Sequence, residues 1–230
     1  ALMPAVRDAL DRLRAGLEQR STFEPSRSTR VFNISARDAG AFILAPEIAR
    51  RLEAEAPGIR IAWSQVQRGA ISTELASSRL DLAIDVPGLR GADLERLTLL
   101  VTPYACVMAR DHPEADTELT MERFIGLRHV VVSSRREGRS YVEEIARAAG
   151  HRITPVMRLP HYMPALEIVR HTHLALTTPL PLAQGSDLAV LALPDAFTAL
   201  DSVLYWRREN AEDPALAWLR DLIVEVADGL

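Results

Sequence analysis

The sequence contains no lysine, so all 27 of its basic residues are arginine. Its 31 acidic residues outnumber them and give a formal net charge of −4. An acidic chain without a block of basic residues has little electrostatic attraction to nucleic-acid phosphates. The composition therefore argues against nucleic-acid binding by this chain alone.

Cysteine occurs once, at Cys106, which excludes a disulfide within the chain and is typical of a reducing cytoplasm. Because Cys106 stands in the apolar run "YACVMA", we expect a buried, unreactive thiol. No apolar run approaches the roughly 18 residues of a membrane-spanning helix. No signal segment opens the chain either, so the sequence predicts a cytoplasmic protein.

Motifs for metal binding and catalysis are also lacking. The chain has no HExxH, CxxC, GxSxG, SxxK, GxGxxG or P-loop pattern. His171 and His173 are separated by one residue at the end of a predicted helix, so they point different ways, and we interpret them as solvent-exposed. We expect no metal and no cofactor, and an enzyme is the least favoured function.

The chain does show a regular alternation of strand and helix patterns. With 230 residues, 48% of them hydrophobic, it can form one large or two small domains. The alternation, which restarts after residue 104, predicts two α/β units with crossover helices. Strands are expected at 31–35, 59–66, 80–85, 94–101, 104–109, 129–134, 153–159, 174–178, 188–193 and 201–207, and helices at 41–56, 71–78, 138–149, 162–171 and 214–227.

The first residues have a different pattern. Residues 1–20 predict an amphipathic helix with a narrow apolar stripe like a coiled-coil seam. A polar segment with Pro25 follows. Since the chain starts without Met and in mid-helix, we interpret it as a fragment of a longer protein. The stripe consists of Leu2, Val6, Leu10, Leu13 and Leu17.

Polar side chains stand where predicted strands meet predicted helices. Ser35, Arg37 and Asp38 follow the first strand, and Ser134 and Arg136 follow the strand at 129–134. In open α/β sheets, ligands bind beyond the carboxyl ends of strands, where helix N-termini favour anions. The alternatives are helix capping for the serines and solvated surface positions for the arginines. The pattern predicts a small-molecule site that can hold an anion.

Two further strand ends carry the sequences "RLPHYMPA" and "LTTPLP". His161 follows one strand and opens the next helix, and its imidazole can donate to or accept from a phenol or a carboxylate. We predict that His161 binds a ligand, with Tyr162 or Tyr104 as an aromatic wall. The alternative is that His161 only caps its helix.

Several segments together resemble the effector domain of LysR-type transcriptional regulators. The motif F-x-P-S-x-S-x-R-x-F, here from Phe23 to Phe32, resembles the start of that domain. Ser78, in "LASSRLDLAID", stands where the family commonly has glycine. The other segments that carry the resemblance are "LAPEIARRLEAEAPGIRI", "MARDHP" and "EDPALAWLRDLIVEV".

The resemblance implies two Rossmann-like subdomains with two hinge crossovers, similar to type 2 periplasmic binding proteins. It also implies a DNA-binding winged helix-turn-helix before this segment, and assembly into a homodimer or homotetramer. Contact with DNA would be made only through that preceding domain. The implied organisation is the end of a linker helix at 1–22, a linker at 23–30, subdomain I at 31–103 and 201–230, and subdomain II at 104–200.

"LPHYMPA" and "HLALTTP" resemble segments of the LysR branch that senses aromatic and phenolic compounds. The implied function is binding of a small aromatic effector, which can be anionic, in the cleft of the fold. Arg37 departs from the uncharged residue expected there. A solute-binding protein of the same fold is the alternative. The predicted ligand-binding residues are Ser35, Arg37, Asp38, Thr102, Tyr104, Ser134, Arg136, His161, Tyr162, Thr177 and Trp206.

Overall fold

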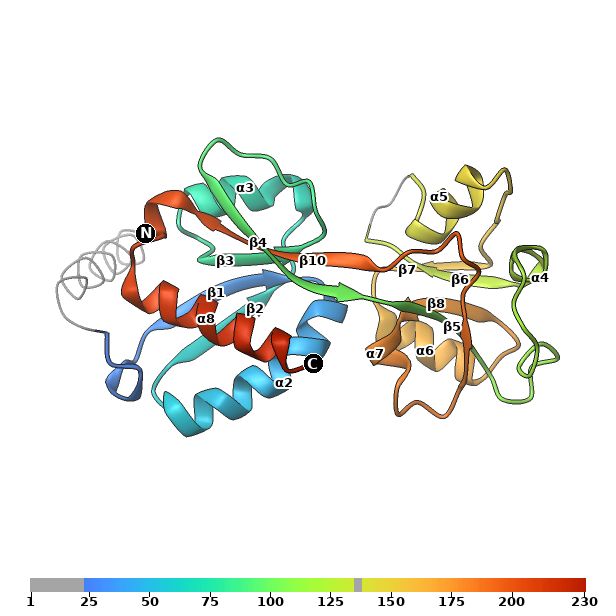
Figure 1. The fold of residues 1–230 in the computed structure, drawn as a ribbon, viewed down its shortest axis with the longest axis horizontal. Coiled ribbons are helices and arrows are strands. Elements are labelled where there is room, and N and C mark those ends of the chain that lie inside the picture. The colour runs from blue at the N-terminus through green and yellow to red at the C-terminus, as the bar shows by residue number, and fades with distance from the viewer. Residues whose placement is uncertain (1–22, 135–137) are drawn as a thin grey trace, which may run out of the picture. The chain divides into compact units, whose positions relative to one another are not determined.

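The computed structural model describes residues 23–134 and 138–230. They form two compact units, each built on a five-stranded mixed sheet (Figure 1). Unit 1 holds residues 23–36, 44–99 and 203–230, and unit 2 holds 37–43 and 100–202. The predicted helix at 1–20 and Arg136 lie outside the described residues. The α/β architecture that the alternating pattern predicted is confirmed.

Unit 1 has the strand order β2-β1-β3-β10-β4. Strands β1, β2 and β3 run parallel, and β10 returns from the far end of the chain to pair antiparallel with β3. The parallel strands are joined by crossover helices, as parallel pairing requires. The elements that lie wholly or mostly in unit 1 are η1 (Pro25–Arg27), β1 (Val31–Ala36), α2 (Asp38–Glu55), β2 (Arg60–Ser64), α3 (Arg68–Ala76), β3 (Leu82–Asp85), β4 (Leu94–Thr102), β10 (Leu200–Arg207), η2 (Arg208–Asn210) and α8 (Pro214–Asp228).

Helices cover both faces of this sheet. In Figure 1, α3 lies on one face, and α2 and α8 lie on the other. Helix α8 buries its apolar side against the unit, and Asp213 begins it by accepting hydrogen bonds from the amides of Ala215 and Leu216. Arg30 lies 2.8 Å from the same carboxylate and so ties the start of the described chain to its last helix.

Unit 2 repeats this plan with the strand order β7-β6-β8-β5-β9. Strands β6, β7 and β8 are parallel, whereas β5 is antiparallel to both β8 and β9. One apolar cluster includes α5 and a second includes α6, so both faces of the sheet are covered. The elements are β5 (Tyr104–Met108), α4 (Met121–Gly126), β6 (His129–Val132), α5 (Tyr141–Ala148), β7 (Met157–Leu159), α6 (Tyr162–Arg170), β8 (Ala175–Pro179), α7 (Leu180–Ala183) and β9 (Ala189–Ala192).

Several predicted boundaries are wrong. Helix α2 begins at Asp38 rather than 41, and β7 begins at Met157 rather than 153, because Pro155 has no amide to donate to a strand ladder. Helix α5 begins at Tyr141, since Ser140 and Glu143 form a capping box there. The short helices α4 and α7 were not predicted.

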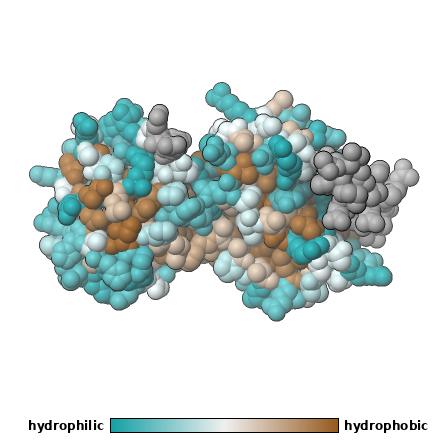
Figure 2. All heavy atoms as spheres, turned by 180° about the vertical axis from the view of Figure 1, so that it is seen from behind, coloured by the Kyte–Doolittle hydropathy of each residue, from teal (hydrophilic) through white to brown (hydrophobic). Residues whose placement is uncertain are grey.

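The face shown in Figure 2 is mostly polar, but it carries apolar patches, seen in brown. Among the large exposed apolar side chains are Phe42, which is 47% exposed, and Met163, which is 52% exposed. Cys106 is fully buried, and burial raises the pKa of its thiol to about 12, as expected for an unreactive cysteine. None of the helices that the structure describes is long and apolar enough to cross a membrane.

Ser78, the residue that stands in place of the family's glycine, has a φ of 55°. It follows helix α3, where the amide of Ser78 donates to the carbonyl of Leu75 and the amide of Arg79 donates to that of Glu74. These two bonds form a Schellman motif, whose left-handed position is usually glycine. The Cβ of Ser78 therefore strains the backbone.

We predict that Ser78→Gly raises the free energy of unfolding by about 1 kcal/mol, because glycine adopts a left-handed φ without this strain. Ser77, the preceding residue, has a φ of −89° and is the matched control. Ser77→Gly should lower the same free energy by roughly 0.5–1 kcal/mol. Urea unfolding of both variants measures the difference, and equal effects would contradict the interpretation.

Candidate functional site

The first turns of helices α2 and α6 meet within unit 2. Residues 37–43, which include the start of α2, belong to this unit by their contacts. Ala39 and Ile43 pack on the apolar cluster that includes Leu166 of α6. Packing of these apolar side chains places Arg37 and Asp38 beside the N-terminus of α6.

Asp38 caps helix α6 from a distant part of the sequence. The amide of Tyr162, the first residue of the helix, donates to Oδ2 of Asp38 at 2.5 Å. The adjacent His161 occupies the N-cap position, but its side chain makes no capping hydrogen bond. The alternative prediction that His161 only caps its helix is therefore wrong. Its Nδ1 lies 3.9 Å from the same Asp38 oxygen, and the imidazole is half-exposed.

Two tyrosines complete this group of residues. Tyr104, at the start of β5, and Tyr162 lie within electrostatic range of each other, and Arg37 and Asp38 lie within electrostatic range of both phenols. Burial raises the pKa of Tyr104 and raises that of Tyr162 further, to well above its ordinary value. We call Arg37, Asp38, Tyr104, His161 and Tyr162 the Asp38 cluster.

Sequence reasoning gave Tyr141 no role, yet it extends the aromatic wall. Its ring centroid is 5.3 Å from that of Tyr104, and its hydroxyl donates to the carbonyl of Thr198 at 2.6 Å. The ring of Phe197 meets that of Tyr141 edge-to-face, with the centroids 6.0 Å apart. The sequence signal that could have identified Tyr141 is its position directly after the Ser140 cap, at the N-terminus of a helix.

Other predicted site residues are engaged elsewhere. Ser35 is buried in unit 1, where its Oγ accepts from the amide of Val66 at 3.1 Å and does not cap α2. Trp206, also in unit 1, has its ring covered by the guanidinium of Arg220 at 4.7 Å. The structure does not bring either residue into the Asp38 cluster.

Ser134 is exposed and does not open a helix, because β6 ends at Val132 and α5 is capped by Ser140. The expectation that Ser134 lies at a helix N-terminus is therefore wrong. Thr102 is buried at the end of β4. Thr177 is buried in β8, opposite Cys106, and its hydroxyl has no hydrogen-bond partner among the described residues.

The histidines do not form a metal site. His171 pairs with Glu167 on its own helix at 2.8 Å, and His173 lies 3.7 Å from Asp111. Within residues 23–134 and 138–230, no group of three or more His, Cys, Asp or Glu side chains could hold a metal ion.

Comparison with known proteins assigns most of the chain to one protein family. Residues 26–228 match the family model described as the LysR substrate binding domain. The transcriptional activator NagR of a Ralstonia species is 29% identical over 223 residues, which cover 95% of this chain and 74% of NagR.

Solved structures agree with this match. A probable transcriptional regulator from Pseudomonas aeruginosa superposes with a TM-score of 0.85 at 29% identity, covering 96% of this chain and 75% of that one. The BenM effector-binding domain, solved with its effector benzoate, has a TM-score of 0.69 at 19% identity. It covers 86% of this chain and 90% of that one, and at this identity the likeness concerns the fold alone.

We predict that Tyr162→Phe removes the phenol that ionises at the highest pH. The folded-state pKa of Tyr162 lies above the unfolded value of about 10. The protonated phenol therefore favours folding, and this stability is lost as the pH rises from the unfolded pKa through the folded one. Alkaline titration of phenolate absorbance measures the change. If the absorbance change that the variant loses occurs at the ordinary pH of about 10, the cluster is not assembled as described.

Proposed function

Because the chain belongs to the LysR substrate-binding domain family, we infer that it is the effector-binding domain of a transcription regulator and not an enzyme. We propose that its effector is a small aromatic compound bound at the Asp38 cluster. The match does not favour the alternative of a solute-binding protein. The observation that carries the proposal is the convergence of Asp38, Tyr104, His161 and Tyr162 at one helix N-terminus.

Aromatic binding is supported by the apolar surface beside the cluster. Phe42 lies four residues after Asp38, on the same side of α2, and Met163 follows Tyr162 in the first turn of α6. Both are exposed, and together with the ring of Tyr104 they offer apolar and aromatic contacts to a flat ligand. The related fold of BenM holds benzoate, which agrees with an aromatic effector.

The polar group of the effector is constrained by Asp38. The sequence predicted that helix N-termini would hold an anion, but the Asp38 carboxylate already accepts the first amide of α6. The Asp38 carboxylate repels a second carboxylate placed beside it, whereas the guanidinium of Arg37 in the same cluster attracts one. A phenolic hydroxyl fits better, because it can donate to Asp38 and accept from the imidazole of His161. We therefore propose a phenol rather than a simple aromatic carboxylate.

Thermal unfolding with phenol, catechol and benzoate tests this function. A ligand at 100 times its Kd should stabilise the chain by about 2.7 kcal/mol, and the phenols should stabilise it more than benzoate does. We predict that His161→Ala weakens binding of the best phenol by roughly 1–3 kcal/mol, the cost of an unpaired polar group. Its melting temperature without ligand should stay the same, since His161 makes no capping bond.

The matched control is His171→Ala, at the exposed C-terminal end of the same helix. It should bind the phenol as the parent does. Equal binding by His161→Ala and the parent would show that the Asp38 cluster is not the effector site.

We also propose that the chain assembles with itself, because the leucine stripe that the sequence predicts at 1–20 can be buried only against a partner. Exposed apolar side chains such as Val101, 63% exposed, add surface that association can cover. Sedimentation at about 10–50 µM, a range chosen from weak-dimer affinities, should show a dimer or tetramer. A single monomeric species would contradict this proposal without affecting the effector site.

A further inference from the structure

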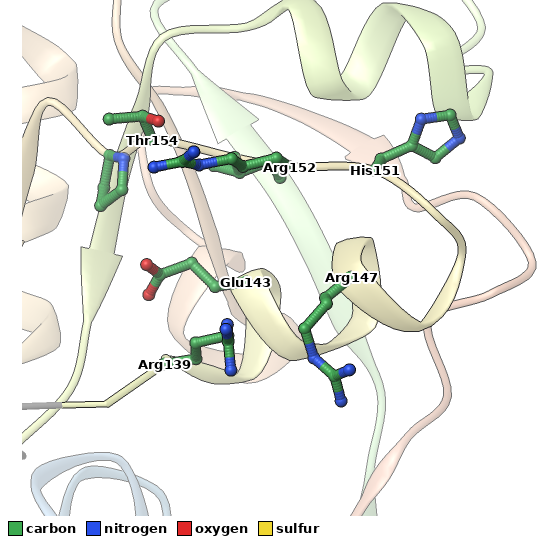
Figure 3. A pocket seen from close by; sticks show the side chains of 8 residues that line it. Arg139, Glu143, Arg147, His151, Arg152 and Thr154 are labelled. Atoms are coloured by element: carbon green, nitrogen blue, oxygen red, sulfur yellow. The ribbon is translucent and has the colours of Figure 1, made fainter.

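Unit 2 carries a hollow of about 550 Å³ that shares no residue with the Asp38 cluster. Its volume lies within the range of small-molecule pockets, about 300–1,000 Å³. Helix α5 forms one side and the extended segment after it forms the other (Figure 3). The lining residues are Arg139, Glu143, Arg147, His151, Arg152, Ile153, Thr154 and Pro155.

The turn after α5 creates this hollow. Gly150 has a φ of 83°, and the amide of His151 donates back to the carbonyl of Ala146 at 2.8 Å. The chain therefore reverses at the helix end and runs back along α5. This reversal places Arg152 and Thr154 across from Glu143 and Arg147, which lie four residues apart on one side of the helix (Figure 3).

The acidic side chains at the hollow are already bound. Glu143 accepts from the amide and the hydroxyl of Ser140 and lies 2.7 Å from Arg158. Although burial alone would raise the pKa of Glu143, these hydrogen bonds and Arg158 outweigh it and lower the pKa, so the carboxylate stays charged. Glu144 pairs with Arg147 at 3.1 Å and with Arg139 at 3.4 Å.

Positive charge remains after these pairings. The two glutamates are accompanied by four arginines, which leaves an excess of two positive charges. The arginines are Arg139, Arg147, Arg152 and Arg158. The guanidinium of Arg152 has neither an ion pair nor a hydrogen bond to the part of the chain that the structure describes. Nη1 of Arg158 is buried and also lacks a hydrogen-bond partner among those residues.

We propose that this hollow binds a small dianion, either a phosphate group or a dicarboxylate, at a site separate from the effector site. Guanidinium groups bind carboxylate and phosphate through paired N–H donors. A dianion neutralises the two excess charges, and the Thr154 hydroxyl on the lining can add a further hydrogen bond. Since the whole chain has a net charge of −4, this excess is a local property of the hollow.

Thermal unfolding and titration calorimetry with sodium phosphate and sodium succinate, each matched in ionic strength by sodium chloride, test the proposal. At least one dianion should raise the melting temperature above that in chloride, and the stronger of the two identifies the ligand class. Arg152→Gln should weaken this binding at least fivefold. The variant should fold as the parent does, because Arg152 is exposed and makes no polar contact with the described residues.

Arg110→Gln is the control, because Arg110 is an exposed arginine of unit 2 that pairs with Asp187 outside the hollow. It should bind the dianion as the parent does. The proposal is overturned if neither dianion exceeds chloride, or if Arg152→Gln and Arg110→Gln bind equally. Binding of phenols should be the same in all three proteins, so failure here is distinct from failure of the effector site.

Discussion

The hydrogen bond from the Tyr162 amide to the Asp38 carboxylate determines the arrangement of the candidate effector site. It joins the first turns of α2 and α6 within unit 2 and provides α6 with the acceptor that its own N-cap residue does not supply. Because Asp38 satisfies the helix terminus, the imidazole of His161 is left half-exposed. A negative side chain at a helix N-terminus is also favoured by the helix dipole. One carboxylate thus explains both the geometry of the candidate site and the proposed preference for a ligand that can donate a hydrogen bond.

The fold was predictable from the sequence because its signals are local. The apolar run "VFNIS" and the buried run at 82–85 gave the strands β1 and β3, and Pro214 marked the start of α8. The capping box of Ser140 and Glu143 is equally local, since the two residues lie three positions apart. The predicted start at 138 passed over this signal, so that error was avoidable.

The candidate site was predictable only in part, because its decisive contact is not local. Asp38 and Tyr162 are 124 positions apart in the sequence, and no spacing rule links a carboxylate to a helix that distant. Position at strand ends selected Arg37, Asp38, His161 and Tyr162, and the structure brings these four residues together. The same rule also selected Ser35, whose hydroxyl is occupied by the amide of Val66. A strand end brings a side chain to the edge of the sheet, but neighbouring backbone donors decide whether it stays available to a ligand.

The two polar regions of unit 2 differ in the net charge that they offer. At the Asp38 cluster the carboxylate of Asp38 and the guanidinium of Arg37 lie beside buried phenols, so no positive charge is left in excess. At the hollow beside α5, paired glutamates leave an excess of arginine, and an anion is favoured. The proposed phenol and the proposed dianion therefore bind in different regions and need not compete. If both bind only the folded chain and do not influence each other, their stabilising effects add. Any departure from this sum is a coupling free energy between the two regions, and it must act equally in both directions.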